Sequence, residues 1–366
     1  MTQGGIQMRA AVLRNTGDTT LDVVGDVGVV DTEAGFVRVA IKATGVCHSD
    51  LSAMNGTIPQ PAPAVLGHEG AGEIVEVGPG VTSVAVGDHV IVVWVPPCGK
   101  CRYCIGGQPN LCSEIMMSAG FSPRFVLDGE PCFGMAGTGT FCEEVVLPEQ
   151  AVVKVDDDVP WEIASLIGCG VMTGVGSAIN AAKVTPGSSV AVFGCGGVGV
   201  SIIQGARLAG AAEIVAIDLV AERRDDALRF GATHAVSPDN LDDVKGEITG
   251  GEGFDYAFEA VGLPSTIRGA YDAARRGGTA CIVGVGRMEE MVSFSAFELF
   301  YAEKTLMGTI YGSADVRRDF SRLIRLWRAG RLDLEGMISQ KVGLGDINTA
   351  LDDMRAGRVI RTVVEI

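Results

Sequence analysis

A glycine-rich turn between an apolar run and a helix-compatible run constrains the fold of this chain more than any other feature. Gly194-Cys-Gly-Gly-Val-Gly199 fits the pattern G-x-G-x-x-G and directly follows the apolar run Ser189–Phe193. Glycines at these three positions permit a tight turn, a close approach of the backbone to a pyrophosphate, and close packing of a helix on a strand. The motif therefore predicts a dinucleotide-binding fold.

The region around this turn, from about residue 160 to 310, alternates apolar strands with helical stretches. We predict strands at Ser189–Phe193, Glu213–Ile217, Phe254–Glu259 and Ala280–Val285. Such alternation is typical of a doubly wound parallel α/β sheet. Earlier residues instead form short runs broken by glycine and proline, such as Glu73–Gly78 and His89–Trp94. These runs indicate a β-rich domain.

The last part of the chain returns to mixed character. We predict helices over Asp319–Ala329 and Ile347–Ala356 and a closing strand over Arg361–Ile366. A chain of 366 residues exceeds what one hydrophobic core usually organises. We therefore predict two domains, one formed by residues 1–170 and 311–366 and a nucleotide-binding domain formed by residues 171–310.

Composition and charge limit the partners. With 47% hydrophobic and 20% charged residues the chain is globular, and its net charge of −16 disfavours nucleic acid and anionic membrane surfaces. The uncharged run Val184–Ala206 is long enough to span a membrane, but Pro186 and six glycines break it into a turn, a strand and a helix start. The chain begins without a secretory signal, so we expect its ten cysteines to be reduced and the protein to be cytoplasmic.

Asp218 ends the strand that follows the glycine turn. At this distance a carboxylate accepts hydrogen bonds from the adenosine ribose, and its charge repels a 2′-phosphate. NAD is therefore favoured over NADP, although Arg223 and Arg224 temper the preference. The alternative is a purely structural glycine turn beside a solvent-facing aspartate.

Four cysteines form a C-x2-C-x2-C-x7-C array: Cys98, Cys101, Cys104 and Cys112. An iron–sulfur cluster, two disulfides and scattered core thiols are the competing interpretations. The last spacing is seven rather than three, and the sequence has no second cluster motif, which favours zinc. Four protein ligands leave no open coordination position, so this zinc is predicted to be structural.

A second set of possible zinc ligands is spread along the chain: Cys47 in Gly45–Asp50, His68 in Gly67–Gly70, and Cys169 in Gly168–Gly170. Isolated residues of these types are more often core or surface residues than ligands. Together with Gly78–Val81, Gly87–His89 and the glycine turn, however, they resemble the zinc-dependent medium-chain alcohol dehydrogenases. The resemblance covers essentially the whole chain, and the insertion between Cys112 and Phe141 is similar to that of the longer, class III-type members.

This resemblance implies a GroES-like catalytic domain, a Rossmann NAD-binding domain, and two zinc ions per chain. By it, Cys47, His68 and Cys169 bind the catalytic zinc, Glu69 lies behind them as an outer or transient ligand, and Asp50 orients the His68 ring. Ser49 matches the hydroxyl that takes the alcohol proton. Many relatives finish the proton relay with a histidine at the position of Ser52.

The resemblance also implies positions for the cofactor and the substrate. It assigns coenzyme contacts to the following residues: Gly194, Gly196, Gly199, Asp218, His48, Arg361, Thr173, Arg223, Val285 and Ile310. Trp94, Met135 and Val285 would line the substrate channel. A large ring near the metal crowds branching at the reacting carbon, so we predict primary alcohols, aliphatic or benzylic.

Thiol-dependent formaldehyde dehydrogenases of this branch bind the glutathione carboxylate with an arginine, and here that position is Met116. Their acidic residues after the Cys-His-Thr-Asp segment are replaced by neutral Asn55–Thr57. Glutathione should therefore bind poorly.

The leading hypothesis is a zinc-dependent oxidoreductase that transfers a hydride between a primary alcohol or aldehyde and NAD. The alternatives are a formaldehyde dehydrogenase that uses an adduct of another thiol, a nicotinoprotein with tightly bound NAD, and a catalytically silent NAD-binding protein. By analogy we expect a homodimer, with a tetramer possible, that pairs through a sheet edge formed by Ala280–Val285 and Met291–Phe294.

Overall fold

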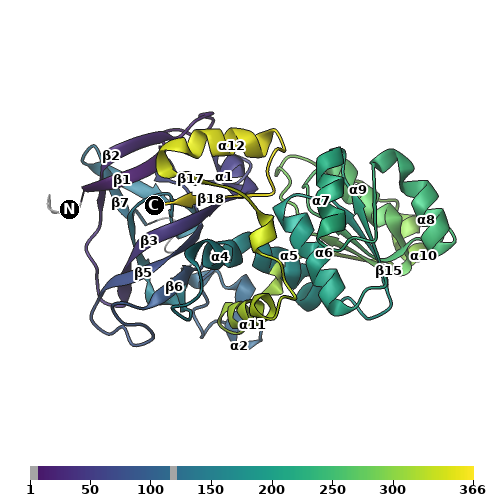
Figure 1. Cartoon of the computed structure of the whole chain (residues 1–366), viewed down its shortest axis with the longest axis horizontal. Helices are drawn as coiled ribbons and strands as arrows, with labels where there is room; N and C mark the ends of the chain where they lie inside the picture. Colours follow the sequence, from purple (N-terminus) through teal and green to yellow (C-terminus); the bar gives the residue numbers. More distant parts are fainter. Residues whose placement is uncertain (1–6, 116–121) are drawn as a thin grey trace. The chain divides into compact units, whose positions relative to one another are not determined.

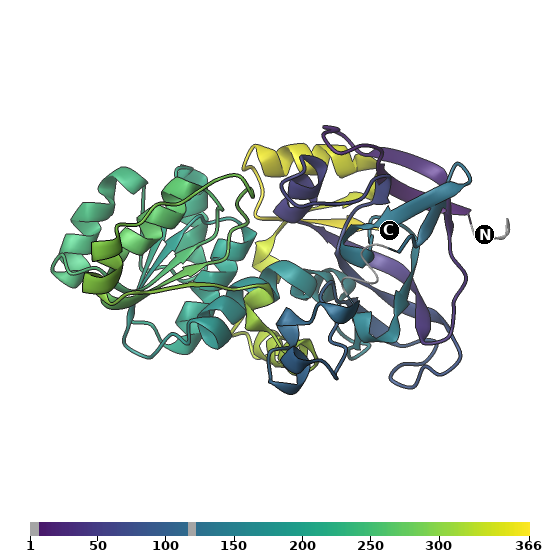
Figure 2. The same cartoon turned by 180° about the vertical axis from the view of Figure 1, so that it is seen from behind.

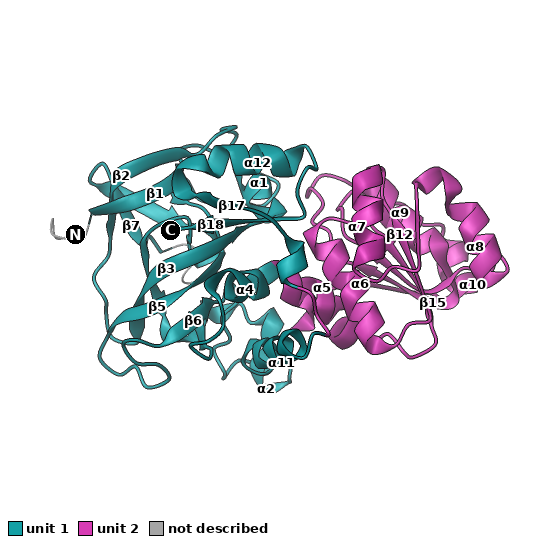
Figure 3. Ribbon diagram, in the orientation of Figure 1, with its two compact units in different colours: residues 1–169, 315–330, 334–366 teal, residues 170–314, 331–333 magenta. Residues whose placement is uncertain are grey.

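The computed structural model describes residues 7–115 and 122–366, and these fold as two compact units (Figure 3). Unit 1 comprises residues 1–169, 315–330 and 334–366, and unit 2 comprises residues 170–314 and 331–333. The sequence-based division differs from this one by one residue at the first boundary and by four at the second. It also did not anticipate the return of residues 331–333 to unit 2.

Unit 1 is built from a closed barrel and an open sheet (Figure 1). The barrel strands, in order, are β1 (Gln7–Leu13), β2 (Asp22–Val29), β7 (Phe125–Leu127), β8 (Glu130–Gly134) and β4 (Ala64–Val65). The sheet strands, in order, are β10 (Val152–Lys154), β6 (His89–Val92), β5 (Glu69–Val77), β3 (Phe36–Val46), β18 (Arg361–Glu365) and β17 (Ile338–Gly343), with β9 (Glu144–Pro148) also paired to β3.

The pairing of β3 places the ends of three strands together. Its alternating apolar residues, Val37, Val39 and Ile41, are buried, as expected of a strand with one face on a core. Gly45 lies opposite Glu69 of β5, and Val46 lies opposite Thr362 of β18, both in antiparallel register. The end of β3, the start of β5 and the start of β18 therefore meet at one edge of the fold.

The helices of unit 1 are α1 (His48–Met54), α2 (Arg102–Ile105), α4 (Trp161–Leu166), α11 (Val316–Arg328) and α12 (Ile347–Arg355). Leu51 of α1 and Leu351 of α12 share one hydrophobic core with Leu13 of β1. The predicted helices over Asp319–Ala329 and Ile347–Ala356 thus correspond to α11 and α12, and α11 begins three residues earlier than expected.

Unit 2 contains one parallel sheet (Figure 2). Its strands, in order, are β13 (His234–Val236), β12 (Glu213–Ile217), β11 (Ser189–Phe193), β14 (Phe254–Glu259), β15 (Ala274–Ile282) and β16 (Thr305–Gly308). The strand order reverses between β11 and β14. In doubly wound sheets, ligands bind outside the carboxyl ends of the strands at such a reversal.

The helices of unit 2 are α5 (Met172–Gly176), α6 (Gly197–Ala209), α7 (Ala221–Arg229), α8 (Leu241–Thr249), α9 (Pro264–Ala273) and α10 (Ala296–Ala302). Val190 and Val192 of β11 pack with residues of α6 and α7, whereas Ala191 and Phe193 pack with residues of α8 and α9. Alternate residues of one strand therefore face opposite helical layers, which confirms the predicted doubly wound α/β class.

The prediction that Ala280–Val285 and Met291–Phe294 form an edge of this sheet was wrong. β15 lies inside the sheet because it pairs with β14 on one side and with β16 on the other. It ends at Ile282, and Met291–Phe294 forms no strand. In the part of unit 2 that the structure describes, β16 forms this edge.

One helical run among the described residues, Trp161–Ala181, is long and apolar enough to cross a membrane by length and composition alone. Its most apolar stretch is 83% buried within the protein, as in the core helix of a globular fold. The uncharged run Val184–Ala206 divides into β11 and α6 on either side of the glycine turn.

Candidate metal centres and nucleotide site

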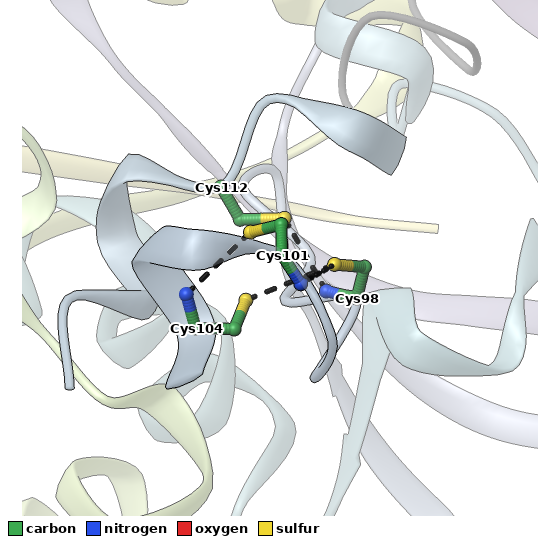
Figure 4. Close-up of side chains that lie close together, drawn as sticks. All are labelled: Cys98, Cys101, Cys104 and Cys112. Carbon is green, nitrogen blue, oxygen red and sulfur yellow. Dashed lines mark hydrogen bonds between the residues drawn. The ribbon is translucent and has the colours of Figure 1, made fainter. Parts of the chain in front are cut away.

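The four cysteines of the closely spaced array converge in a small lobe around α2 (Figure 4). Their sulfur atoms all lie within 4.8 Å of one another. Backbone N–H groups point at the sulfurs: the amides of Cys101 and Lys100 donate to Cys98 Sγ at 3.3 and 3.5 Å, and the Cys98 amide donates to Cys112 Sγ at 3.3 Å. Such donors stabilise thiolates.

The pKa values of the cysteines in this lobe are consistent with a cation shared by the four sulfurs. Hydrogen bonds from the Lys100 amide and then the Cys101 amide, against the effect of burial, lower the pKa of Cys98 to about 7. Burial, together with its cysteine neighbours, raises the pKa of Cys104 to about 12. Four thiolates so close together repel one another unless a cation lies between them, and zinc fits this all-sulfur set.

The second cluster brings together residues that are far apart in the sequence. Cys47 follows the end of β3, His68 precedes β5, Glu69 is the first residue of β5, and Cys169 lies in the π-helical turn Ile167–Val171. All four side chains are buried, and one ligand atom from each lies within 4.8 Å of the others. Two sulfurs, one imidazole nitrogen and a nearby carboxylate form a donor set that zinc accepts.

Asp50 fixes the orientation of His68. Asp50 Oδ1 lies 3.2 Å from His68 Nδ1 and accepts the Gly67 amide at 3.2 Å, while Oδ2 accepts the Cys47 amide at 2.8 Å. Nδ1 therefore faces the carboxylate, and Nε2 is left for the cluster. Nε2 is buried and has no hydrogen-bond partner within residues 7–115 and 122–366, as expected of a nitrogen placed to bind a metal.

The acidities of this cluster also favour a cation. A hydrogen bond from Cys169 and the neighbouring His68 hold the pKa of Cys47 well below its ordinary value, although burial acts in the opposite direction. Burial lowers the pKa of His68, but the charge and hydrogen bond of Asp50 and then Cys47 outweigh it and raise the pKa to about 10. The surroundings of Cys47 thus favour the thiolate, which is the form of cysteine that binds a metal ion.

Glu69 is paired with Arg361, the first residue of β18. The guanidinium donates to the carboxylate, and both side chains are buried. Gly45 leaves room for the pair, because a Cβ there would lie 2.9 Å from the Arg361 nitrogen and 3.2 Å from Glu69 Cδ. Arg361, expected at the coenzyme, thus contacts the carboxylate beside the candidate metal ligands.

Other residues predicted for the catalytic site lie close to these ligands or on the elements that carry them. Ser49 Oγ is half-buried and 3.7 Å from Cys47 Sγ, and the Trp94 ring meets the His68 ring edge-on at 6.3 Å between centroids. His48 is exposed at the start of α1, Ser52 is half-buried, and Met135 is buried.

In unit 2, the glycine turn has the expected strand–turn–helix setting. Gly194 has φ +88°, a conformation that L side chains rarely adopt, and Gly196 caps α6. A Cβ on Gly199 would lie 2.8 Å from the carbonyl carbon of Gly194 and would overlap its oxygen, whereas a Cβ on Gly196 would meet nothing within 4 Å. Gly199 therefore serves packing, while the surface at Gly196 is open.

Asp218 closes β12 beside this turn. Its Oδ2 accepts the Cys195 amide at 2.8 Å and its Oδ1 accepts the Val220 amide at 2.9 Å, and the residue is 8% exposed. The carboxylate thus holds the glycine turn in place. Arg224 donates to the carbonyl oxygen of Asp218 at 2.8 Å.

The remaining cofactor candidates are spread over unit 2. Arg223 and Thr173 are half-buried, and the described structure gives no hydrogen-bond partner for Arg223 Nε or Thr173 Oγ1. Val285 is 52% exposed and Ile310 is 37% exposed. Sequence reasoning overlooked Glu259, a fully buried carboxylate at the end of β14. An acidic residue that closes an apolar strand beside the glycine turn was the signal that could have identified it.

Comparisons with known proteins agree with this arrangement. Residues 33–157 match the alcohol dehydrogenase GroES-like domain, and residues 197–328 match the zinc-binding dehydrogenase family. The chain is 40% identical to S-(hydroxymethyl)glutathione dehydrogenase of Paracoccus denitrificans, over 98% of this chain and 100% of the relative. It is 39% identical to the NDMA-dependent alcohol dehydrogenase of Amycolatopsis methanolica, over 98% of this chain and 99% of the relative. The benzyl alcohol dehydrogenase structure from Acinetobacter calcoaceticus aligns with a TM-score of 0.90 at 32% identity, over 99% of both chains.

Proposed function

The chain belongs to the zinc-dependent medium-chain alcohol dehydrogenase family, and on this premise we propose that Cys47, His68 and Cys169 hold its catalytic zinc. As the family predicts, it is an NAD-dependent alcohol oxidoreductase with a four-cysteine zinc site besides the catalytic one. The observation that carries the proposal is the buried His68 Nε2, directed away from Asp50 and grouped with two cysteine sulfurs.

When bound, the zinc supplies a Lewis acid that lowers the pKa of an alcohol, and NAD accepts the hydride. The protein contributes orientation and proton handling. Asp50 keeps His68 Nδ1 protonated, so that Nε2 is the nitrogen available to the metal. Ser49, half-buried beside Cys47, is the proposed acceptor of the alcohol proton. With Ser52 in place of a histidine, bulk water or another group would carry this proton to solvent.

We infer that the preferred substrates are primary alcohols, aliphatic or benzylic, and the corresponding aldehydes. The Trp94 ring lies against His68, so its bulk adjoins the proposed metal position, and Met135 adds a buried apolar side chain. A wall of this kind disfavours a second substituent on the reacting carbon. The similarity to a benzyl alcohol dehydrogenase supports an aromatic-tolerant pocket.

The test measures both the metal and the reaction. Purified protein should contain two zinc ions per chain, and benzyl alcohol or propan-1-ol with NAD should produce reduced nicotinamide, followed by its absorbance. Propan-2-ol should be oxidised with a lower kcat/KM than propan-1-ol. A higher kcat/KM for propan-2-ol would contradict the assignment of primary alcohols, and one zinc ion per chain would contradict the second metal site.

A thiol adduct of formaldehyde is the second candidate substrate, because a relative at 40% identity is an S-(hydroxymethyl)glutathione dehydrogenase. Asn55–Thr57 stand where the glutathione-dependent relatives carry acidic residues, and here all three are neutral, with Asn55 and Gly56 exposed. Met116 lies outside the described residues. Without charges there to pair with glutathione, an adduct of a less charged thiol is favoured, and formaldehyde assays with and without glutathione distinguish the two.

The nicotinoprotein alternative concerns NAD exchange. We propose that NAD is exchangeable, so that desalted protein should respond to added NAD. Desalted protein that retains nicotinamide and does not respond to added NAD would instead identify a nicotinoprotein. Protein that binds NAD but oxidises no alcohol would identify a catalytically silent NAD-binding relative.

We further propose a cytoplasmic homodimer, with a tetramer as the alternative. No disulfide joins any of the ten cysteines, all of which lie among the described residues, and this suits a reducing compartment. Large apolar side chains near the β16 edge are exposed: Phe300 at 80%, Met291 at 80% and Phe297 at 67%. A second copy that covers this edge would remove them from water. Light scattering of the parent and of Phe300→Glu tests the proposed dimer. A parent that is already monomeric would contradict it.

A further inference from the structure

Glu259 occupies a position that folding alone does not explain. It ends β14, it is fully buried, and β14 is the strand beside β11 where the order of the parallel sheet reverses. The glycine turn leaves β11 at the same edge. This edge is where doubly wound sheets bind their ligands.

One oxygen of the Glu259 side chain organises the turn between β14 and α9. Oε1 accepts the Val261 amide at 2.9 Å, the Gly262 amide at 2.7 Å and the Thr266 hydroxyl at 2.6 Å. The main-chain carbonyl of Glu259 accepts the Gly284 amide at 3.0 Å. One residue thus connects the β14–α9 turn, the first turn of α9 and the segment after β15.

The β14–α9 turn in turn contacts two segments of the nucleotide site. A Cβ on Gly194 would lie 2.6 Å from Val261 Cγ2, and a Cβ on Gly262 would lie 2.5 Å from the Val285 carbonyl oxygen. A Cβ on Gly284 would lie 2.7 Å from Glu259 Oε2 and would overlap the Gly262 nitrogen. The three segments therefore pack without room for a methyl group, and a shift of one displaces the others.

The other carboxylate oxygen of Glu259 makes the burial of this residue unfavourable. Oε2 is buried and finds no hydrogen-bond partner in the described residues. A half-satisfied buried carboxylate disfavours folding, and a neutral side chain of similar volume often serves stability at least as well. The geometry therefore points to a role for the carboxylate other than stability.

We propose that Glu259 is a positioning residue for the dinucleotide: its Oε1 fixes Val261 and Gly262, and these hold Gly194 and Val285 in the arrangement that binds NAD. The inference rests on the proposed NAD-dependent function, and it assigns a residue that does not itself touch the cofactor.

The test compares three variants of the zinc-loaded protein by titration with NAD, by steady-state kinetics and by thermal unfolding. Glu259→Leu keeps the volume but removes the acceptor, and it should raise the Kd and KM for NAD about tenfold or more, the scale of loss that misplaced binding groups produce. The KM for the alcohol, measured at saturating NAD, should stay within about threefold, since the catalytic cluster belongs to unit 1. Glu259→Gln keeps an acceptor oxygen and should restore most of the NAD affinity.

Gly284→Ala tests the same contacts without touching the carboxylate, and it covers the case in which Glu259→Leu does not fold. Its methyl group pushes on Oε2 and on Gly262, so NAD affinity should fall about as much. The double variant should lose less than the two single losses combined, because both act on one turn.

Three results would overturn the inference. The first is a Glu259→Leu protein that binds NAD like the parent. The second is a Glu259→Gln protein as weak as Glu259→Leu. The third is equal losses in the KM for NAD and the KM for the alcohol, which would indicate general disorder. A parent that binds no NAD would instead overturn the proposed function, and this inference with it.

Discussion

Substitution by alanine should have different effects at two glycines of the same turn: it should lower the stability at Gly199 and the NAD affinity at Gly196. The packing does not tolerate Gly199→Ala, because the new Cβ would lie 2.8 Å from the Gly194 carbonyl carbon and closer to its oxygen, whereas real Cβ contacts below 3.0 Å are essentially never found. Helix α6 must move away from β11, and overpacking of this kind costs about 1–3 kcal/mol of unfolding free energy.

Gly196→Ala makes no such contact, because its Cβ would meet nothing within 4 Å and the residue has φ −74°. The loss of chain entropy in the unfolded state and the weaker helix cap nearly offset each other, so stability should change by less than about 1 kcal/mol. The new methyl would nevertheless project from the backbone that approaches the pyrophosphate. NAD affinity should therefore fall at least about tenfold, or about 1.4 kcal/mol.

Thermal or urea unfolding without NAD, followed by NAD titration, separates these effects. Gly246→Ala is the matched control, because Gly246 is exposed within α8 and a Cβ there meets nothing within 4 Å. This change should stabilise unit 2 by about 0.5–1 kcal/mol and leave NAD binding unchanged. A Gly196→Ala protein that binds NAD like the parent would refute the close approach of backbone to cofactor. A Gly199→Ala protein of unchanged stability would refute the packing argument.

Three further predictions concern the metals, the substrate and pH. Cys169→Ser should lose one zinc ion and the activity while keeping the parent's unfolding temperature, whereas Cys112→Ser should lose the other ion and unfold at a lower temperature. Metal analysis with thermal unfolding checks both variants. Loss of both ions from either variant would contradict two independent sites. Trp94→Ala should raise the ratio of kcat/KM for propan-2-ol to that for propan-1-ol by about tenfold or more, and an unchanged ratio would remove Trp94 from the substrate wall. Burial raises the pKa of Asp255, but the Ser189 amide at 2.8 Å and Arg275 at 2.7 Å outweigh it and lower the pKa. The ionised Asp255 carboxylate therefore stabilises the fold fully above its unfolded-state pKa of about 3.9, and this stabilisation is lost as the pH falls through the lower folded-state pKa. Urea unfolding should show Asp255→Asn destabilised at pH 7, and its difference from the parent should shrink below about pH 4.

The sequence predicted the parts of the fold in which local pattern and tertiary structure agree. Ser189–Phe193, Glu213–Ile217 and Phe254–Glu259 are uninterrupted strands in the centre of a parallel sheet, so their apolar runs and their boundaries coincide. β15 was placed too late, because it begins with Ala274-Arg-Arg-Gly-Gly, in which two arginines and a glycine at φ +69° conceal a strand. At this start Ala274 pairs with Phe254 of β14, and the regular pairing with β14 and β16 begins at Thr279.

The candidate metal site, too, was predicted from the sequence only in part. Sequence reasoning named Cys47, His68 and Cys169 through family resemblance, since no local spacing connects them. It could not find the pairing of Glu69 with Arg361, because the partners are 292 residues apart and meet only through the register of β3 with β5 and β18. Glu259 was overlooked because its importance lies in the backbone amides that it accepts, and those depend on a turn geometry that composition does not reveal.

The 292-residue separation of Glu69 from Arg361 also bears on how the protein is made. In the compact lobe, Cys98 and Cys112 are only 14 positions apart, so a growing chain could capture its first metal ion soon after the four cysteines leave the ribosome. The buried carboxylate of Glu69 must wait until β18 has been synthesised before its guanidinium partner arrives. The two metal centres are thus expected to mature in a fixed order during biosynthesis, with the catalytic one last.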